Sequence, residues 1–324
     1  MGIPTTDERS SHDPGSARGA ARLAFIAGPT ASGKTQAAIA VAKALSGGAG
    51  GGAEIVNADS MQVYRDVPIL AAHPTAAEQA AIPHHLFGYL SGDDACSAGR
   101  WARDAGAAIA DIHARNKTAI VVGGSGLYFR ALTHGLSEVP EIPTAVRAAA
   151  RALFDEIGLN AFTAEVLALD PDEPARDRQR LIRAYEVIKA TGTPLSAWRA
   201  APGTPAAPPA QAKVVIAPPR EQLYRRIEAR FDQMVDAGGL AEAERLRAKA
   251  YPADAPVMRA VGAAELLAHL AGEISLERAV ELAKMNSRRL AKRQLTWFRN
   301  QAGDWPTVAT PEAATAAICD RFAA

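Results

Sequence analysis

The sequence predicts an α/β fold in which a parallel sheet core is interrupted by a helical insertion and completed by a helical C-terminal region. Three observations lead to this prediction. Short apolar runs of strand type alternate with helix-type segments, a glycine-rich loop joins the first run to its helix, and residues 140–200 contain no strand pattern. Alternation of this kind is typical of right-handed βαβ units, which build parallel sheets covered by helices on both faces.

Four strands are expected, each identified by a short apolar run. They cover residues 23–27, 54–58, 118–122 and 213–217. A helix with an apolar stripe follows the first run, and an apolar helix begins near Leu127 after the third. Because ligands of parallel sheets bind at the carboxyl ends of the strands, the loops after the first three strands should converge on one crevice.

The chain is expected to divide into three parts. At 324 residues it is about twice the length of a typical domain. Residues 1–20 mix charges with Gly, Pro and Ser and lack the apolar centre of a secretory signal, so they are predicted to form a disordered tail. Residues 201–212 form a Pro/Ala-rich linker. We therefore predict a core from residues 21–139 and 201–324, with a helical insertion over residues 140–200.

Composition excludes several classes of protein. Hydrophobic residues make up 48% and charged residues 22%, as in ordinary globular domains. Thirty-six basic residues balance 35 acidic ones, so any site for a polyanion must come from local clustering of charge. Two cysteines are too few for a disulfide scaffold or a four-ligand zinc site. No apolar stretch is long enough to span a bilayer. We expect a cytoplasmic protein with no membrane contact and no obligate protein partner.

A phosphate-binding loop follows the first strand. The sequence GPTASGKT matches G-x-x-x-x-G-K-[ST] between a strand and a helix, the context that the motif requires. Its glycines let backbone N–H groups turn toward phosphate oxygens, while its lysine and threonine suit an outer phosphate and Mg²⁺. The motif predicts a P-loop NTPase-like core that binds a di- or triphosphate. Its residues are Gly28, Pro29, Thr30, Ala31, Ser32, Gly33, Lys34 and Thr35.

Two polar residues follow other predicted strands. Asp59 either acts as a metal ligand or base, or caps the turn through Ser60. Ser125, between two glycines, either offers its hydroxyl to a ligand or caps the next helix. The adjacent His84 and His85 are expected to pack or turn near the crevice, because no zinc-ligand spacing accompanies them.

Basic residues gather in two places despite the near-zero net charge. One cluster lies on the predicted C-terminal helix without an acidic residue, and the other surrounds Gln179 in the insertion. A solvated face is the usual meaning of such a stripe, but two of them favour contact with a nucleic-acid backbone. The residues are Lys284, Arg288, Arg289, Lys292, Arg293 and Arg299 in the first cluster, and Arg176, Arg178, Arg180 and Arg183 in the second.

Several stretches together resemble the bacterial tRNA dimethylallyltransferases, also called tRNA isopentenyltransferases. A P-loop alone is shared by many unrelated enzymes, whereas this ordered set is specific and spans nearly the whole chain. The matching stretches are GPTASGKT, DSMQVYRD, PHHL, VGGSGLYFRAL, DRQRLIRAYEV, RIEARF, RAVG and AKRQLTWFR.

The resemblance implies transfer of a dimethylallyl group from its diphosphate to the exocyclic N6 amine of the adenine 3′ of a tRNA anticodon, giving N6-isopentenyladenosine. The P-loop would then cradle the diphosphate of the donor, with Arg230 on the same group and Mg²⁺ held through Thr35. Asp59 matches the catalytic aspartate that takes the proton of the amine, and Ser125 lies at a second catalytic position. The adenine must leave the anticodon stack to reach the donor.

The resemblance also implies contacts with the tRNA anticodon stem-loop along the chain. The insertion would grip the anticodon arm. The implied contact residues are Asp59, Ser60, Met61, Gln62, Arg147, Gln179, Arg180, Leu181, Ile182, Arg183, Arg259, Lys292, Arg293, Gln294, Trp297 and Arg299.

The sequence departs from the family pattern at four positions. Ser125 stands where Thr is common, and Ala263 replaces a Tyr after RAVG. His73 and Ala71 replace the Lys and Thr of a T-A-K-P stretch, so no contact is carried over to that segment.

Two other functions fit the P-loop. A small-molecule P-loop kinase would use Asp59 as a base toward a hydroxyl acceptor, and an NTP-gated RNA-binding switch would modify nothing. The basic C-terminal helix argues against the kinase, because a small substrate does not require it.

Overall fold

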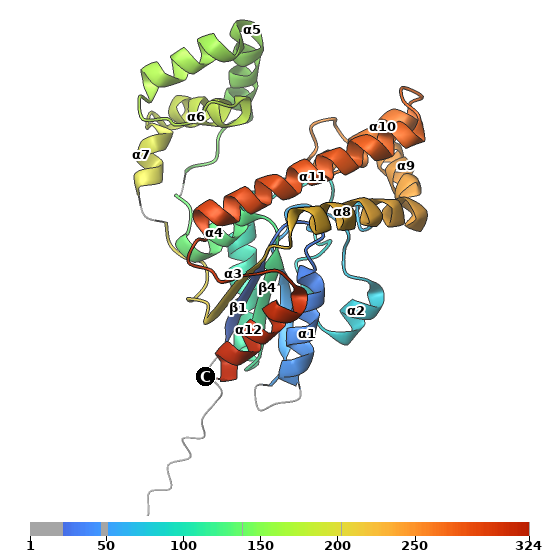
Figure 1. Cartoon of the computed structure of the whole chain (residues 1–324). Coiled ribbons are helices and arrows are strands. Elements are labelled where there is room, and N and C mark those ends of the chain that lie inside the picture. Colours follow the sequence, from blue (N-terminus) through green and yellow to red (C-terminus); the bar gives the residue numbers. More distant parts are fainter. Residues whose placement is uncertain (1–21, 47–50, 138, 202, 324) are drawn as a thin grey trace, which may run out of the picture.

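The computed structural model describes residues 22–46, 51–137, 139–201 and 203–323. Its sheet has six parallel strands in the order β3-β2-β4-β1-β5-β6 (Figure 1). The strands are β1 Leu23–Ala27, β2 Ala53–Asn57, β3 His84–His85, β4 Thr118–Gly123, β5 Ala212–Ile216 and β6 Thr307–Val308. The predicted α/β fold is confirmed, and the four predicted strands lie within one residue of their expected bounds. The tail expected over residues 1–20 lies outside the described residues.

The short strands β3 and β6 were not predicted, because two residues carry no periodic pattern. The side chains of β3 do not line the pocket described below. Nδ1 of His84 lies 2.7 Å from the Ile82 carbonyl oxygen, and Nε2 of His85 lies 2.7 Å from the buried Glu54 carboxylate on β2. Arg115 and Lys117 donate to the same carboxylate, and the hydrogen bond from Arg115 is the largest cause lowering its pKa to about 2. The short helix α2 Ala76–Ala81 precedes β3.

Helices cover both faces of the sheet. Helices α1 Lys34–Ser46 and α12 Pro311–Ala323 pack on one face, and α3 Ala98–Ala114 and α4 Gly126–His134 pack on the other (Figure 1). Adjacent strand residues point to opposite faces, so Phe25 joins the apolar cluster under α3 and α4, while Ile26 joins the cluster under α1 and α12.

The segment between β4 and β5 forms a helical unit with its own apolar cluster. It contains α5 Thr144–Leu169, with a kink at Gly158, α6 Arg178–Thr191 and α7 Leu195–Ala200. Phe154 and Phe162 of α5 meet Leu181 and Val187 of α6 in this cluster. Figure 1 shows the unit standing apart from the sheet. We therefore keep the interpretation of residues 140–200 as an insertion.

The region after β5 is mainly helical and lies over the carboxyl end of the sheet (Figure 1). It comprises α8 Arg220–Met234, a π-turn Val235–Gly239, α9 Leu240–Ala248, a 3₁₀ turn Pro256–Arg259, α10 Ala263–Leu270 and α11 Leu276–Gln301. The chain then returns to the sheet through β6 and α12. Across the described ranges, no helix combines the length and the apolar character needed to cross a membrane.

Candidate active site

The P-loop forms a tight cradle at the carboxyl end of β1. Gly28 and Gly33 both have positive φ angles, +153° and +92°. A Cβ atom on Gly28 would lie 2.5 Å from the Ile216 carbonyl oxygen, and one on Gly33 would collide with Pro311 of α12. Helix α1 begins at Lys34, so its N-terminus and its N–H groups face the cradle. Only glycine suits these two positions, which explains their place in the motif.

Two cations flank the cradle. Lys34 Nζ donates to the Pro29 carbonyl oxygen over 2.6 Å, and Arg230 of α8 donates to the Thr30 hydroxyl over 3.3 Å. Burial lowers the pKa of Lys34 to about 8, with Asp59 opposing the shift and Arg230 adding to it. Burial likewise lowers the pKa of Arg230, again opposed by Asp59. Lys34, Arg230 and Asp59 therefore lie close enough to interact electrostatically. The hydrogen bond from Arg230 to Thr30 joins residues that are 200 positions apart in the sequence.

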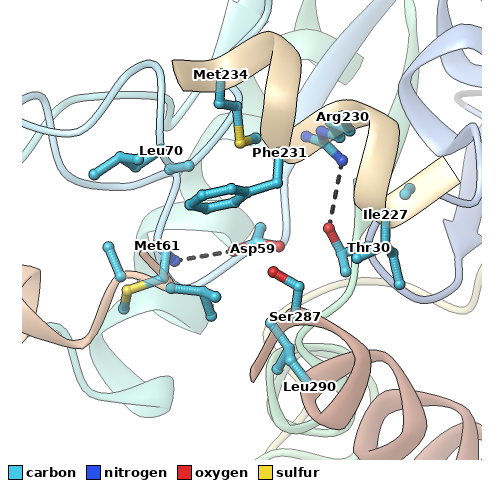
Figure 2. A pocket seen from close by; sticks show the side chains of 14 residues that line it. Thr30, Asp59, Met61, Leu70, Ile227, Arg230, Phe231, Met234, Ser287 and Leu290 are labelled. Carbon is cyan, nitrogen blue, oxygen red and sulfur yellow. Dashed lines mark hydrogen bonds between the residues drawn. The ribbon is translucent and has the colours of Figure 1, made fainter. Parts of the chain in front are cut away.

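Asp59 follows β2 on a backbone that neighbouring side chains hold in place. Its own N–H donates to Asn57 Oδ1 over 2.8 Å, and its Oδ1 accepts the Met61 N–H over 3.0 Å. The Asn57 amide also donates to the carbonyl oxygens of Asp59 and Leu86. The expected turn-capping contact is thus formed, but at Met61 and not at Ser60. Asp59 also lines the pocket shared by the P-loop and α8 (Figure 2).

Ser125 supports the same backbone. Its hydroxyl oxygen accepts the Ser60 N–H over 2.9 Å. Ser125 stands at the N-cap position of α4, as one alternative expected, but its side chain forms no cap hydrogen bond to that helix. Ser125 does not line the pocket, and its catalytic role stays a prediction. At Gly123 a Cβ atom would collide with the Ala58 carbonyl, so only glycine lets the ends of β2 and β4 approach this closely.

An apolar pocket of about 600 Å³, including the space at its open mouth, adjoins the cradle. Figure 2 shows its walls, with Phe231 and Met234 from α8 facing Leu290 from α11 across Asp59. Asp59, Arg230, Thr30 and Ser287 are its polar groups. The remaining lining residues are Ala31, Met61, Leu70, Ala71, Ile227, Phe231, Met234, Ala260, Val261 and Leu290. Such a pocket suits a hydrocarbon group attached to an anion that binds in the cradle.

Two faces of α11 have different surroundings. Lys284 and Arg288 pair with Asp232 and Glu228 of α8 at 2.6 Å, so these two cations of the basic stripe are neutralised within the protein and are not free for a nucleic-acid backbone. The other cations of the stripe are Arg289, Lys292, Arg293 and Arg299; all four are exposed, and none forms an ion pair within the described residues.

The other implied tRNA contacts differ in how exposed their side chains are. Arg147, Gln179, Arg180 and Arg259 are exposed, Arg183, Ser60, Met61 and Trp297 are half-buried, and these remain predictions. Leu181 and Ile182 are not available as side-chain contacts, because both pack in the core of the insertion at 0% and 7% exposure. Gln62 is engaged internally, since its amide donates to the carbonyl oxygens of Ala71 and Ala72.

Three supporting residues escaped the sequence prediction. Asn57 is a polar residue at the end of a buried strand, two positions before Asp59, so the sequence did contain a signal for it. Glu242 is fully buried and accepts the N–H groups of Ile69 and Leu70, which holds one pocket wall. Ser287 extends from α11 toward Asp59 in Figure 2. Neither Glu242 nor Ser287 belongs to a local pattern that indicates its place.

The fold and the site define a P-loop α/β protein in which a phosphate cradle, an apolar pocket and one carboxylate meet. The family model described as IPP transferase matches residues 62–301, and a second, described as isopentenyl transferase, matches residues 21–87. The chain belongs to the IPP transferase family.

Similar proteins agree with this assignment. A tRNA dimethylallyltransferase of Maricaulis maris is 49% identical over 91% of this chain and 96% of its own length. A second, from Phenylobacterium zucineum, is 50% identical over 88% and 92%. The structure of a tRNA isopentenylpyrophosphate transferase from Bacillus halodurans matches with a TM-score of 0.65, at 32% identity over 93% and 97%. A eukaryotic dimethylallyltransferase, described as acting on tRNA, matches with a TM-score of 0.75, at 25% identity over 94% and 77%.

Proposed function

We propose that this protein transfers the dimethylallyl group of dimethylallyl diphosphate to the N6 amine of the adenine 3′ of a tRNA anticodon. The observation that carries the proposal is the direct continuation of the phosphate cradle into an apolar pocket with Asp59 in its wall. Curated relatives named tRNA dimethylallyltransferase support it at 43–50% identity.

Each part of the site has a task in this reaction. The P-loop amides, Lys34 and Arg230 stabilise the diphosphate as the bond between its oxygen and the allylic carbon breaks. The apolar walls hold the five-carbon group. The adenine nitrogen forms the new bond to that carbon and gives one proton to Asp59, so the products are the prenylated base and diphosphate.

The residues present fit a magnesium ion. Mg²⁺ takes most of its ligands from substrate phosphates and water, and needs few from the protein. The Thr35 hydroxyl at the start of α1 would hold it, together with the substrate diphosphate and water. Among the described residues, no group of three or more His, Cys, Asp or Glu side chains is suited to a metal ion. Ser32 Oγ, buried in the cradle without a described partner, is available to a phosphate oxygen. A bound ion would neutralise charge on the leaving diphosphate.

The decisive experiment incubates the protein with tRNA and dimethylallyl diphosphate and examines the digested nucleosides by mass spectrometry. We expect one prenyl unit on adenosine. A parallel incubation with ATP and no prenyl donor tests the kinase alternative. Phosphate transfer to a small acceptor, with unmodified adenosine in a competent tRNA, would replace the proposed function with the kinase.

Donor binding should weaken at alkaline pH. Below about pH 8 the free enzyme carries the Lys34 ammonium, and as the pH rises through that value the proton is lost before the anion binds. The affinity for dimethylallyl diphosphate should then fall by up to about tenfold per pH unit. Calorimetric titrations between pH 7 and pH 9.5 measure this effect. Lys34→Arg should remove the dependence, because a guanidinium does not titrate in this range; a dependence that persists in this variant must come from another group.

The exposed cations of α11 should contribute to tRNA affinity. Replacing Lys292 and Arg293 with Ala is expected to lower the slope of log affinity against log salt by about 1.5, because each phosphate contact contributes about 0.7 to 0.9. Filter binding at several salt concentrations measures the slope. Lys284→Ala, which removes a paired cation from the same helix, is the control and should leave the slope unchanged. Equal slopes for all three proteins would mean that Lys292 and Arg293 face solvent in the complex.

A further inference from the structure

One residue of the basic helix has its polar atoms turned inward. Gln294 of α11 accepts the Thr30 N–H at Oε1 over 2.9 Å and donates from Nε2 to the Gly124 carbonyl oxygen over 3.0 Å. A Cβ atom on Gly124 would collide with this amide, so the glycine leaves the space that it occupies. Gln294 therefore joins the P-loop to the loop between β4 and α4.

Both partners of Gln294 lead to reacting parts of the proposed site. Thr30 also accepts a hydrogen bond from Arg230, so α11 and α8 hold the same cradle residue through different atoms. Gly124 precedes Ser125, whose hydroxyl accepts the N–H of Ser60, the neighbour of Asp59. A continuous series of contacts thus connects Thr30 in the cradle, through Gln294 and the loop of Gly124 and Ser125, to the backbone beside Asp59.

The neighbours of Gln294 distinguish the two sides of α11. Lys292 and Arg293 are exposed, whereas Trp297, one turn later, packs where a Cβ atom on Gly126 would lie. With one amide atom bonded to each glycine loop, Gln294 is oriented away from the surface on which the cations lie. This placement differs from the tRNA contact that the sequence resemblance implies for it.

We propose that Gln294 is a positioning residue that fixes the diphosphate cradle relative to Asp59, and that it does not contact tRNA. The proposal rests on the proposed prenyl transfer for its kinetic consequence, but not for its effect on anion binding. Losing both hydrogen bonds frees the Thr30 amide and the Gly124 loop. The cradle then becomes less preorganised for diphosphate, and the distance between the allylic carbon and the base becomes less well defined.

The test compares Gln294→Met, which keeps the side-chain volume but makes neither hydrogen bond, with Gln294→Ala and with Lys292→Ala as the control on the same helix. Calorimetry with inorganic pyrophosphate, tRNA filter binding, steady-state kinetics and thermal unfolding are measured for each protein. Both Gln294 variants should bind pyrophosphate about tenfold more weakly, the effect of losing one to two ordinary hydrogen bonds. Their kcat should fall at saturating donor, while their tRNA affinity is unchanged. Lys292→Ala should instead keep the wild-type affinity for pyrophosphate and bind tRNA more weakly.

Two results would overturn the proposal. Wild-type pyrophosphate affinity and kcat in Gln294→Met would mean that packing, and not hydrogen bonding, is the role of this side chain. A loss of tRNA affinity with unchanged pyrophosphate binding would make Gln294 a tRNA contact. If the wild-type protein transfers no prenyl group, the proposed function fails, while the pyrophosphate titrations still decide the role of Gln294.

Discussion

Asp59→Asn is expected to lower kcat for prenyl transfer by about 10²- to 10⁴-fold, the usual contribution of a positioned general base. The adenine amine is a weak nucleophile because its lone pair is delocalised into the ring, so its proton must leave as the new bond forms. Asparagine keeps the oxygen that accepts the Met61 N–H and therefore preserves the turn. The variant loses only the capacity to take the proton.

Single-turnover rates at saturating tRNA and donor measure this effect directly, because product release does not enter them. Asp93→Asn, which neutralises an exposed carboxylate in the loop before α3, is the control and should keep the wild-type rate. The affinity for tRNA should be nearly unchanged in Asp59→Asn. An equal loss of tRNA affinity and rate would instead assign Asp59 to recognition of the RNA.

Lys34→Ala is expected to lower kcat/KM for dimethylallyl diphosphate by about 10²- to 10³-fold, the range seen when one preorganised donor to a developing anion is removed. The ammonium lies within the cradle, next to the Pro29 carbonyl and in the field of Asp59 and Arg230. Its loss leaves the departing diphosphate with one cation fewer, and Arg230 remains beside Thr30 as the other cation of the cradle.

The control for this variant comes from the same helix. Lys43, in the last turn of α1, is exposed, so Lys43→Ala removes the same charge without touching the cradle. We expect its kcat/KM to remain close to the wild-type value. Initial rates at varied donor and fixed saturating tRNA give both constants. Similar losses in the two variants would indicate a general electrostatic effect of the protein and not a contact at the P-loop.

Local patterns predicted the elements that carry the site. The mainly apolar runs before Gly28 and Asp59, and the run that ends at Gly123, are strands because they are buried on both faces of a parallel sheet, and such strands have mainly apolar sequences. The crevice at their carboxyl ends followed from topology alone.

Local sequence patterns could not predict the contacts of residues whose neighbours are distant in the sequence. Arg230 entered only through the family resemblance, because nothing near it in sequence indicates that α8 meets the P-loop. The pairing of Lys284 and Arg288 with α8 required knowledge of which helix lies beside α11. Leu181 and Ile182 were included among the implied tRNA contacts because they lie in the matching stretch DRQRLIRAYEV. Their apolar side chains instead form part of the core of the insertion.

The contact between Gly33 and Pro311 has a consequence for how the P-loop reaches its final shape. The P-loop and α12 lie far apart in the sequence, yet α12 packs against α1 and abuts the loop. Helix α1 also packs on the sheet, but the part of its apolar side that meets Ala314 and Ile318 is covered only when α12 is in place. The shape of the diphosphate cradle therefore depends on the docking of a helix that follows it by more than 270 residues in the chain.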